Sequence, residues 1–405
     1  MKTALLLKEI AAFRVFGEAT SCEKMQFLDL SLPVFVNEFW TSKQRAGHPL
    51  HEISYRACFK PQLPRFFIDR LTQVGDVVYD PFMGRGTTLL EAALLGRKVI
   101  GCDINPLSER LVRPRIEIPD LEAIRTRLEG IELNGSGDMP EDLLTFYHPK
   151  TLRQILALRA YLLERESSGQ IDSVDRWIRM VATNRLTGHS PGFFSVYTMP
   201  PNQAVSVASQ KRINTRRNQA PPRRELKEIV LKKTRSLQRK ISGTDRVQLQ
   251  KAAASARYFT CSCDSTPEIE TSSVDLVVTS PPFLDVIDYR SDNWLRGWFN
   301  HFDSEAVPIW QLKKPEDWVA VMRPVFRELA RVLKRGGRIA FEVGEVRNAK
   351  LKMETLVLRA ATEVGLVPEF VLINRQKFTK TSNCWGVTNG TRGTNTNRVV
   401  VFHQP

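Results

Sequence analysis

Residues 75–106 read GDVVYDPFMGRGTTLLEAALLGRKVIGCDINP, and this stretch decides the fold. An apolar run, Val77 to Tyr79, is followed by a glycine-rich turn, a segment of helix formers and a second apolar run. Gly84 and Gly86 in the turn permit backbone angles that side chains disfavour. The stretch predicts one βαβ unit whose second strand ends in an acidic residue, Asp103.

A second α/β stretch lies much later in the chain. It begins with SSVDLVVTSPPF (272–283), continues through the helical pattern DWVAVMRPVFRELARVLKRGG (317–337) and reaches a strand in RIAFEVGEV (338–346). EFVLINRQKF (369–378) and TNRVVVFHQ (396–404) are typical of a closing antiparallel pair. Together the two stretches predict an α/β, doubly wound, seven-stranded Rossmann-like sheet.

The residues between these stretches do not alternate in this way. They show helical patterns at 121–132, 141–166 and 171–186, which predict a largely helical insertion domain after the second strand. The sequence therefore divides into four parts: an N-terminal arm (1–45), the first part of the sheet domain (46–110), the insertion (111–257) and the second part of the sheet domain (258–405).

The chain is strongly basic, and the charge is concentrated. Its 405 residues carry a formal net charge of +15. Residues 211–240 hold 12 Lys or Arg against two Glu, a local charge of +10. Concentrated positive charge favours a polyanionic surface, and nucleic acid is the obvious intracellular polyanion. The alternative is a solvated basic segment without a partner.

Cysteine spacing and the N-terminus set limits on the class of protein. None of the six cysteines has the spacing of metal ligands, so we expect a reduced, intracellular protein without a metal. Lys8 and Glu9 interrupt the apolar start before a signal peptide or membrane span forms, so no membrane is expected as a partner.

A glycine-rich turn and a carboxylate ending the next strand have the shape of a nucleoside-cofactor pocket. The turn brings backbone close to a ligand, while Asp103 is able to accept hydrogen bonds from both hydroxyls of a ribose. The turn is not GxGxxG and lacks the GK[ST] of a phosphate loop. Dinucleotides and nucleoside triphosphates are therefore disfavoured.

Two motifs carry a family resemblance. DPFMGRGTT (80–88) with VIGCDINP (99–106) resembles the cofactor motif of S-adenosylmethionine-dependent amino-methyltransferases of DNA, and TSPPF (279–283) resembles their catalytic motif. The resemblance extends over about 46–110 and 258–402. It implies a methyltransferase sheet, S-adenosyl-L-methionine as cofactor and double-stranded DNA as partner.

The resemblance also implies roles for single residues. Asp80, Phe82, Gly84, Gly86 and Thr87 line the methionine end of the cofactor, Asp103 takes the ribose, and Asp264 lies near the adenine amine. Lys60, Pro81, Thr88 and Ile104 belong to the same cofactor site.

The Ser-Pro-Pro-Phe corner suits methyl transfer to an exocyclic amine. The lone pair of such an amine is delocalised into the base, so acceptors that hold its two N–H groups favour the transition state. We expect the Ser280 hydroxyl and the Pro281 carbonyl to be those acceptors, with Pro282 fixing the backbone and Phe283 stacking on a flipped base.

Several functions stay open. Serine before the two prolines resembles enzymes acting on N4 of cytosine, while N6 of adenine is the alternative. Carbon-5 methylation is disfavoured because it needs a cysteine after proline, which the chain lacks. An RNA amino-methyltransferase acting on rRNA or tRNA, and a nucleic-acid-binding protein with a vestigial methyltransferase fold, are further alternatives.

The insertion supplies candidates for contacts with DNA. We expect these basic residues to contact phosphates: Arg216, Arg217, Arg223, Arg224, Lys232 and Lys233. Trp385, in a polar C-terminal loop, either stacks on the target base or anchors the loop in the core. A companion restriction endonuclease is a further candidate partner, and we expect a cytoplasmic, nucleoid-associated protein of a prokaryotic or phage-infected cell.

Overall fold

The structure is a computed structural model. It describes the chain except for residues 1, 28, 42–46, 56–57, 136–138, 199–203, 283, 285–288, 345–350 and 376–395, and except for the side chains of 2, 3, 289 and 290.

Nine strands form one sheet in the part of the chain that the structure describes. Their bounds are β1 (Ser21–Phe27), β2 (Leu30–Asn37), β3 (Val77–Asp80), β4 (Lys98–Cys102), β5 (Arg257–Phe259), β6 (Val274–Thr279), β7 (Leu333–Gly344), β8 (Val367–Arg375) and β9 (Thr396–His403). The spatial order is β1-β2-β8-β9-β7-β6-β3-β4-β5. The order reverses at β3 and β6, where a ligand crevice is expected in such a sheet.

Strands β3 to β9 form the predicted doubly wound sheet. Neighbours from β5 to β7 run parallel, whereas β9 is antiparallel to both β7 and β8. The predicted antiparallel closing pair is confirmed by the β8–β9 register.

The sheet has two strands more than predicted. Strand β2 pairs in parallel with β8 and buries Val34 and Phe35, while β1 pairs antiparallel with β2 at the edge. Most of β1 is exposed, because an edge strand needs only one partner and its polar side chains remain in water.

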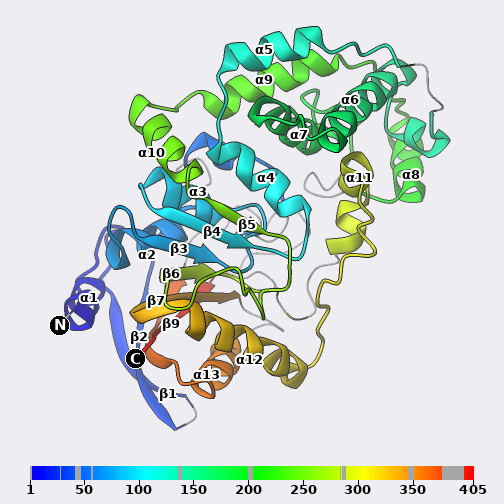
Figure 1. The fold of residues 1–405 in the computed structure, drawn as a ribbon. Coiled ribbons are helices and arrows are strands. Elements are labelled where there is room, and N and C mark those ends of the chain that lie inside the picture. Colours follow the sequence, from blue (N-terminus) through cyan, green and yellow to red (C-terminus); the bar gives the residue numbers. More distant parts are fainter. Residues whose placement is uncertain are drawn as a thin grey trace.

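Helices cover both faces of this sheet (Figure 1). One face carries α2 (Gln62–Leu71), α3 (Thr87–Leu94), α4 (Leu107–Ile116) and α10 (Gly243–Ala253); the opposite face carries α12 (Pro315–Val332) and α13 (Met353–Thr362). Each face has its own hydrophobic cluster. The N-terminal α1 (Lys2–Ala11) adds Leu6 and Ile10 to the first cluster.

A helical layer lies beyond α4, between β4 and β5 in sequence (Figure 1). It contains α5 (Leu121–Gly130), the 3-10 helix η3 (Glu141–Thr145), α6 (Pro149–Ser167), α7 (Ser173–Arg185), α8 (Val207–Arg217) and α9 (Leu226–Gln238). Trp177 on α7 is fully buried and donates from Nε1 to Thr234 Oγ1 on α9 at 3.0 Å. This bond pins two helices of the layer together.

Two further elements frame the site. The 3-10 helix η2 (Pro49–His51) precedes α2, and α11 (Tyr289–Asn300) follows the Ser-Pro-Pro corner and reaches the helical layer (Figure 1). Among the described residues, no helix is both long and apolar enough to cross a membrane.

Candidate active site

A pocket of about 880 Å³, including its mouth, opens at the carboxyl ends of β3, β4 and β6. The lining residues come from six segments: Tyr55, Cys58 and Phe59; Asp80 to Arg85 with Thr87; Asp103 to Asn105; Cys261 to Cys263; Ser280 and Pro282; and Pro308 to Trp310. The pocket therefore joins both sequence motifs.

The carboxylate of Asp103 is held by the glycine-rich turn. Gly84 N donates to Asp103 Oδ2, and Asn105 N donates to Asp103 Oδ1, each at 2.8 Å. Burial raises the pKa of Asp103, while these two backbone bonds lower it. Each oxygen retains acceptor capacity for a further donor such as a hydroxyl.

Gly86 is required by both backbone and packing. Its φ is 72°, in the left-handed region, and a Cβ there would lie 2.4 Å from Cγ2 of Val112 on α4. Helix α3 begins at the next residue, Thr87. Gly86 thus lets α3 start directly after the turn and pack closely on α4.

Asp80 lies at the base of the pocket with only 1% of its surface exposed. Its Oδ1 accepts from Thr279 Oγ1 at 2.6 Å and from Phe82 N at 3.1 Å. Burial raises the pKa of Asp80 to about 7, although these hydrogen bonds oppose the shift. A cationic ligand group would favour the ionised form.

The Ser-Pro-Pro corner follows β6 without a break. Ser280 and Pro282 line the pocket and Pro281 is buried. The Pro282 carbonyl accepts from Nε1 of the buried Trp318 at 3.3 Å. That carbonyl is therefore engaged in holding the corner in place, whereas Pro281 does not line the pocket. The predicted stacking residue Phe283 lies outside the described residues.

Most of the predicted cofactor residues come together at this pocket. Asp80, Pro81, Phe82, Gly84, Thr87, Asp103 and Ile104 line it. Gly86, Thr88, Lys60 and Asp264 do not line it.

Those four residues lie just behind the wall or next to it. The Thr88 hydroxyl donates to the Val278 carbonyl at 3.0 Å, so Thr88 ties α3 to β6. Lys60 is half-buried, and burial followed by the charge of Arg85 lowers its pKa. Asp264 follows Cys263, which is a wall residue.

Several wall residues were not predicted. Tyr55 and Phe59 come from the segment before α2, and Trp310 from the segment before α12. Trp310 packs edge-on against Phe82, with ring centroids 6.2 Å apart. The only sequence signal for this wall was the presence of aromatic side chains in two irregular segments. Their spacing in the sequence does not indicate that they meet at one site.

The basic residues of the insertion are divided between two helices. Arg216 and Arg217 are exposed at the end of α8, where the Arg217 guanidinium lies 3.8 Å from the centre of the Tyr197 ring. Lys232 is exposed on α9, whereas Lys233 is half-buried. Burial and the nearby charge of Arg185 lower the pKa of Lys233 to about 8.

Arg223 and Arg224 lie between these helices in the chain. Arg223 pairs with Glu225 at 2.7 Å, and Arg224 is half-buried. Trp385 lies outside the described residues.

Helix α8 is tied to the Ser-Pro-Pro corner through α11. Trp294 Nε1 donates to the Val205 carbonyl at 3.2 Å, and Ala204 N donates to the Asp292 carbonyl at 3.0 Å. Ala204 and Val205 directly precede Ser206, which is the N-cap residue of α8. Helix α11 itself begins nine residues after Ser280. Helix α11 thus joins the Ser-Pro-Pro corner to the N-terminal end of α8, whereas Arg216 and Arg217 lie at the opposite end of that helix.

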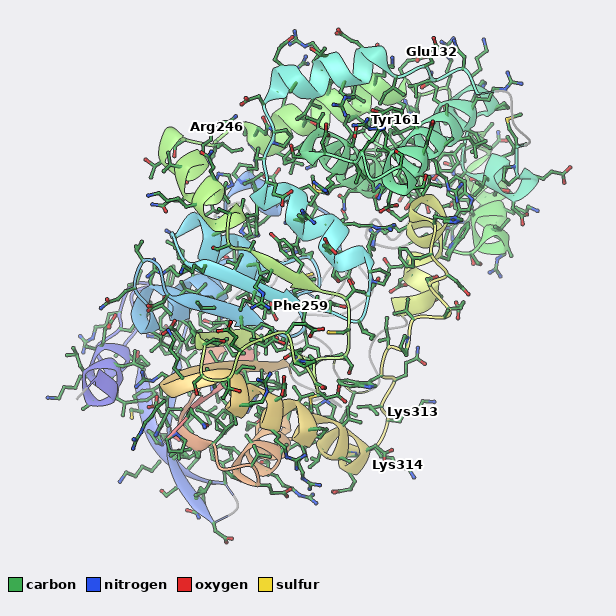
Figure 2. All side chains as sticks on the ribbon, in the orientation of Figure 1. Glu132, Tyr161, Arg246, Phe259, Lys313 and Lys314 are labelled. Carbon is green, nitrogen blue, oxygen red and sulfur yellow. The ribbon has the colours of Figure 1, made fainter. Side chains whose placement is uncertain are left out.

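Figure 2 shows where several labelled side chains lie relative to the sheet and the helical layer. Phe259 marks the end of β5 near the sheet edge, Tyr161 lies in the helical layer, and Lys313 and Lys314 lie at the outer side before α12. Within the described residues, no group of three or more His, Cys, Asp or Glu side chains is placed to hold a metal ion.

The doubly wound sheet and a pocket with one buried carboxylate, Asp80, and one half-buried carboxylate, Asp103, are typical of a nucleoside-cofactor-binding α/β protein. The family described as DNA methylase matches residues 27–112 and 274–404, more than half of the chain. The chain belongs to this family.

Similar curated proteins match only short parts of the chain. Type II methyltransferase M.MjaII of Methanocaldococcus jannaschii is 36% identical over 86 residues, which cover 21% of this chain and 16% of that protein. The tRNA (guanine(10)-N2)-dimethyltransferase of the same organism is 45% identical over 58 residues, covering 14% and 16%. The matched part is thus about a sixth of each relative's length.

Among solved structures, a geranyl diphosphate methyltransferase in complex with GPP and sinefungin aligns over 85% of this chain and 77% of its own. The identity is 11% and the TM-score 0.35. The strand order and register given above, rather than this superposition, define the fold.

Proposed function

We propose that the protein is a DNA amino-methyltransferase that moves a methyl group from S-adenosyl-L-methionine to the exocyclic N4 amine of cytosine in duplex DNA. The observation that carries the proposal is the Asp80–Thr279 hydrogen bond, because it brings the cofactor motif and the Ser-Pro-Pro corner into one pocket. Membership of the DNA methylase family supports the substrate class.

The side chains of the pocket fit this cofactor. Asp80 is a buried carboxylate that a positively charged amino or sulfonium group would stabilise in its ionised form. Asp103 offers two fixed acceptors for ribose hydroxyls. Phe82, Trp310 and Phe59 supply apolar and aromatic surface for the remainder.

S-adenosylmethionine supplies a methyl group that is activated by a sulfonium. In the proposed reaction the amine nitrogen attacks the methyl carbon, the electron pair of the carbon–sulfur bond goes to sulfur, and the nitrogen then releases one proton to water. Ser280 Oγ and the Pro281 carbonyl accept from the amine N–H groups and direct its lone pair at the methyl carbon.

The target base must leave the duplex to reach this pocket. We assign the phosphate contacts that hold the distorted duplex to Arg216 and Arg217 first, because they are exposed on the helix that α11 connects to the corner. Arg223, Arg224, Lys232, Lys233 and Trp385 stay candidates for further contacts.

Two alternative substrates share this geometry. The N6 amine of adenine presents the same pair of N–H groups to Ser280. An RNA amine is the second alternative, and the short match to a tRNA dimethyltransferase favours testing it. A companion restriction endonuclease and association with the nucleoid are part of the proposal that the substrate is DNA.

The test is methyl transfer from labelled S-adenosylmethionine to duplex DNA and to total RNA in parallel, with wild type, Ser280→Ala and Asp103→Ala. We expect label in DNA, strongly reduced by both substitutions. Single-molecule sequencing of the methylated DNA then reports base and recognition sequence. Label in RNA alone, or equal transfer by all three proteins, would overturn the proposal.

A further inference from the structure

A buried carboxylate lies beside the Ser-Pro-Pro corner on the neighbouring strand. Glu342 of β7 is 3% exposed. The parallel β6–β7 register pairs Thr279 with Phe341, so Ser280 and Glu342, the next residue of each segment, project to the same face. This register places the Ser280 hydroxyl beside the Glu342 carboxylate, and hydrogen bonding from Ser280 lowers the pKa of Glu342.

The other side of this carboxylate is occupied by an amide of fixed orientation. Asn397 Nδ2 on β9 donates to Glu342 Oε1 at 2.9 Å. The buried Trp40 donates from Nε1 to Asn397 Oδ1 at 3.4 Å. Because an indole N–H only donates, Trp40 determines which end of the Asn397 amide faces Glu342.

The polarity of Ser280 follows from these contacts. An ionised carboxylate has no hydrogen to give, so the hydroxyl hydrogen of Ser280 points to Glu342. The Oγ lone pairs are then left for the pocket, which Ser280 lines. A serine without such a partner would rotate its hydrogen to suit either a donor or an acceptor.

We propose that Glu342 is a positioning residue that makes Ser280 an obligatory acceptor, so that the site selects an amine and rejects a carbonyl at the same position of the base. This inference rests on the proposed function, because it concerns the amine that Ser280 would hold. It adds to that function that Glu342, a residue outside both motifs, determines the choice between a base with an amine and its deaminated counterpart.

The ionisation of Glu342 is set locally. Burial raises its pKa, and the bonds from Ser280 and Asn397 lower it. Charged groups on adjoining elements are engaged elsewhere: Arg398 of β9 pairs with Glu354, Arg338 of β7 with Glu369 of β8, and Asp80 of β3 accepts from Thr279. A protonated Glu342 no longer fixes Ser280, so methyl transfer falls as pH drops through this raised pKa.

Glu342→Gln is the decisive variant. Asn397, held by Trp40, requires an acceptor opposite its amide, so the new glutamine turns its oxygen to Asn397 and its NH2 to Ser280. The Ser280 hydrogen then points into the pocket. We expect kcat to fall by roughly 100-fold, the scale of losing one transition-state hydrogen bond, with the Kd for S-adenosylmethionine little changed.

Two readouts separate positioning from a structural role. If Glu342 acts through Ser280, Ser280→Ala with Glu342→Gln is no slower than Ser280→Ala alone. In competition binding, wild type should prefer a duplex with the target amine over one carrying uracil for cytosine or hypoxanthine for adenine, and Glu342→Gln should lose or reverse that preference.

Glu354→Gln is the matched control. Glu354 is a second buried carboxylate, 2% exposed. It does not line the pocket, and it pairs with Arg398 at a distance of 2.6 Å. Its variant should keep wild-type kcat, base preference and pH profile in the folded fraction.

The outcomes distinguish the two proposals. If wild type transfers methyl to DNA and Ser280→Ala is impaired, but Glu342→Gln is as fast as wild type or multiplies the defect of Ser280→Ala, the inference on Glu342 alone fails. If wild type transfers no methyl to an amine of DNA or RNA, the proposed function fails and the inference with it.

Discussion

Thr279 donates its hydroxyl hydrogen to the carboxylate of Asp80 across 2.6 Å, although 199 positions separate them in the chain. Asp80 ends β3 and Thr279 ends β6, two neighbouring parallel strands. The bond therefore fixes the distance between the glycine-rich turn and the Ser-Pro-Pro corner. The pocket therefore requires β3 and β6 to end at the same edge of the sheet.

Asp80→Asn should change how stability depends on pH. With a folded pKa of about 7 against an ordinary 3.8, Asp80 keeps its proton in the folded state while the unfolded chain loses it. Wild-type stability is therefore lost as pH rises from about 4 to 7, by roughly 4 kcal/mol from this group. The asparagine does not titrate, and its oxygen still accepts from Thr279 and Phe82.

Urea unfolding at pH 5 and pH 8 measures this effect. The stability of the variant relative to wild type should increase with pH. A constant difference across pH would contradict the assignment. Calorimetry should also show weaker binding of S-adenosylmethionine to Asp80→Asn.

Gly86→Ala should destabilise the fold. The left-handed backbone costs an alanine roughly 1–2 kcal/mol, and the contact of its Cβ with Val112 adds overpacking of similar size. We expect a total loss of about 3 kcal/mol by chemical denaturation. Gly130→Ala on α5 is the control, since nothing lies within 4 Å of its Cβ, and it should be neutral or slightly stabilising.

Replacing Arg216 and Arg217 by alanine should weaken DNA binding and flatten its salt dependence. Each phosphate contact contributes about 0.9 to the slope of log K against log salt, so losing two lowers the slope by about 1.8. Filter binding or fluorescence anisotropy over a salt series checks this. Arg125→Ala with Arg246→Ala removes the same charge from α5 and α10, and an equal change there would refute a specific role for α8.

Trp318→Phe should loosen the corner. It removes the donor to the Pro282 carbonyl and should cost about 1–2 kcal/mol of stability. We expect kcat for methyl transfer to fall about tenfold with less change in KM. Trp177→Phe loses an equivalent buried bond to Thr234 in the helical layer, so a similar fall in kcat there would show that general destabilisation is responsible.

The sheet was readable from the sequence because its central strands are continuous apolar runs separated by helical patterns. Strand β1, SCEKMQF, escaped prediction because it lies at an edge with most side chains exposed and carries no alternation. The charge run at 211–240 was visible, but its division between α8 and α9 was not, since charge density says nothing about which way each helix faces.

The site was predictable only where a motif contains it. Asp80, Gly84, Asp103 and Ser280 lie in the two motifs and reach the pocket. Glu342 lies within the apolar strand RIAFEVGEV and was hidden there, because its partner is supplied by strand register and not by a neighbour in sequence. Long-range pairing is the information that residue spacing lacks.

Strand β9 lies between β7 and β8, yet it follows both in the chain. During synthesis β7 and β8 therefore each keep one unpaired edge until residues 396–403 have left the ribosome. Closure depends on contacts between distant segments, which form slowly. A transcript cut short before these residues would yield a protein without the strand that joins β7 to β8, so premature termination should produce aggregation and not a smaller folded protein.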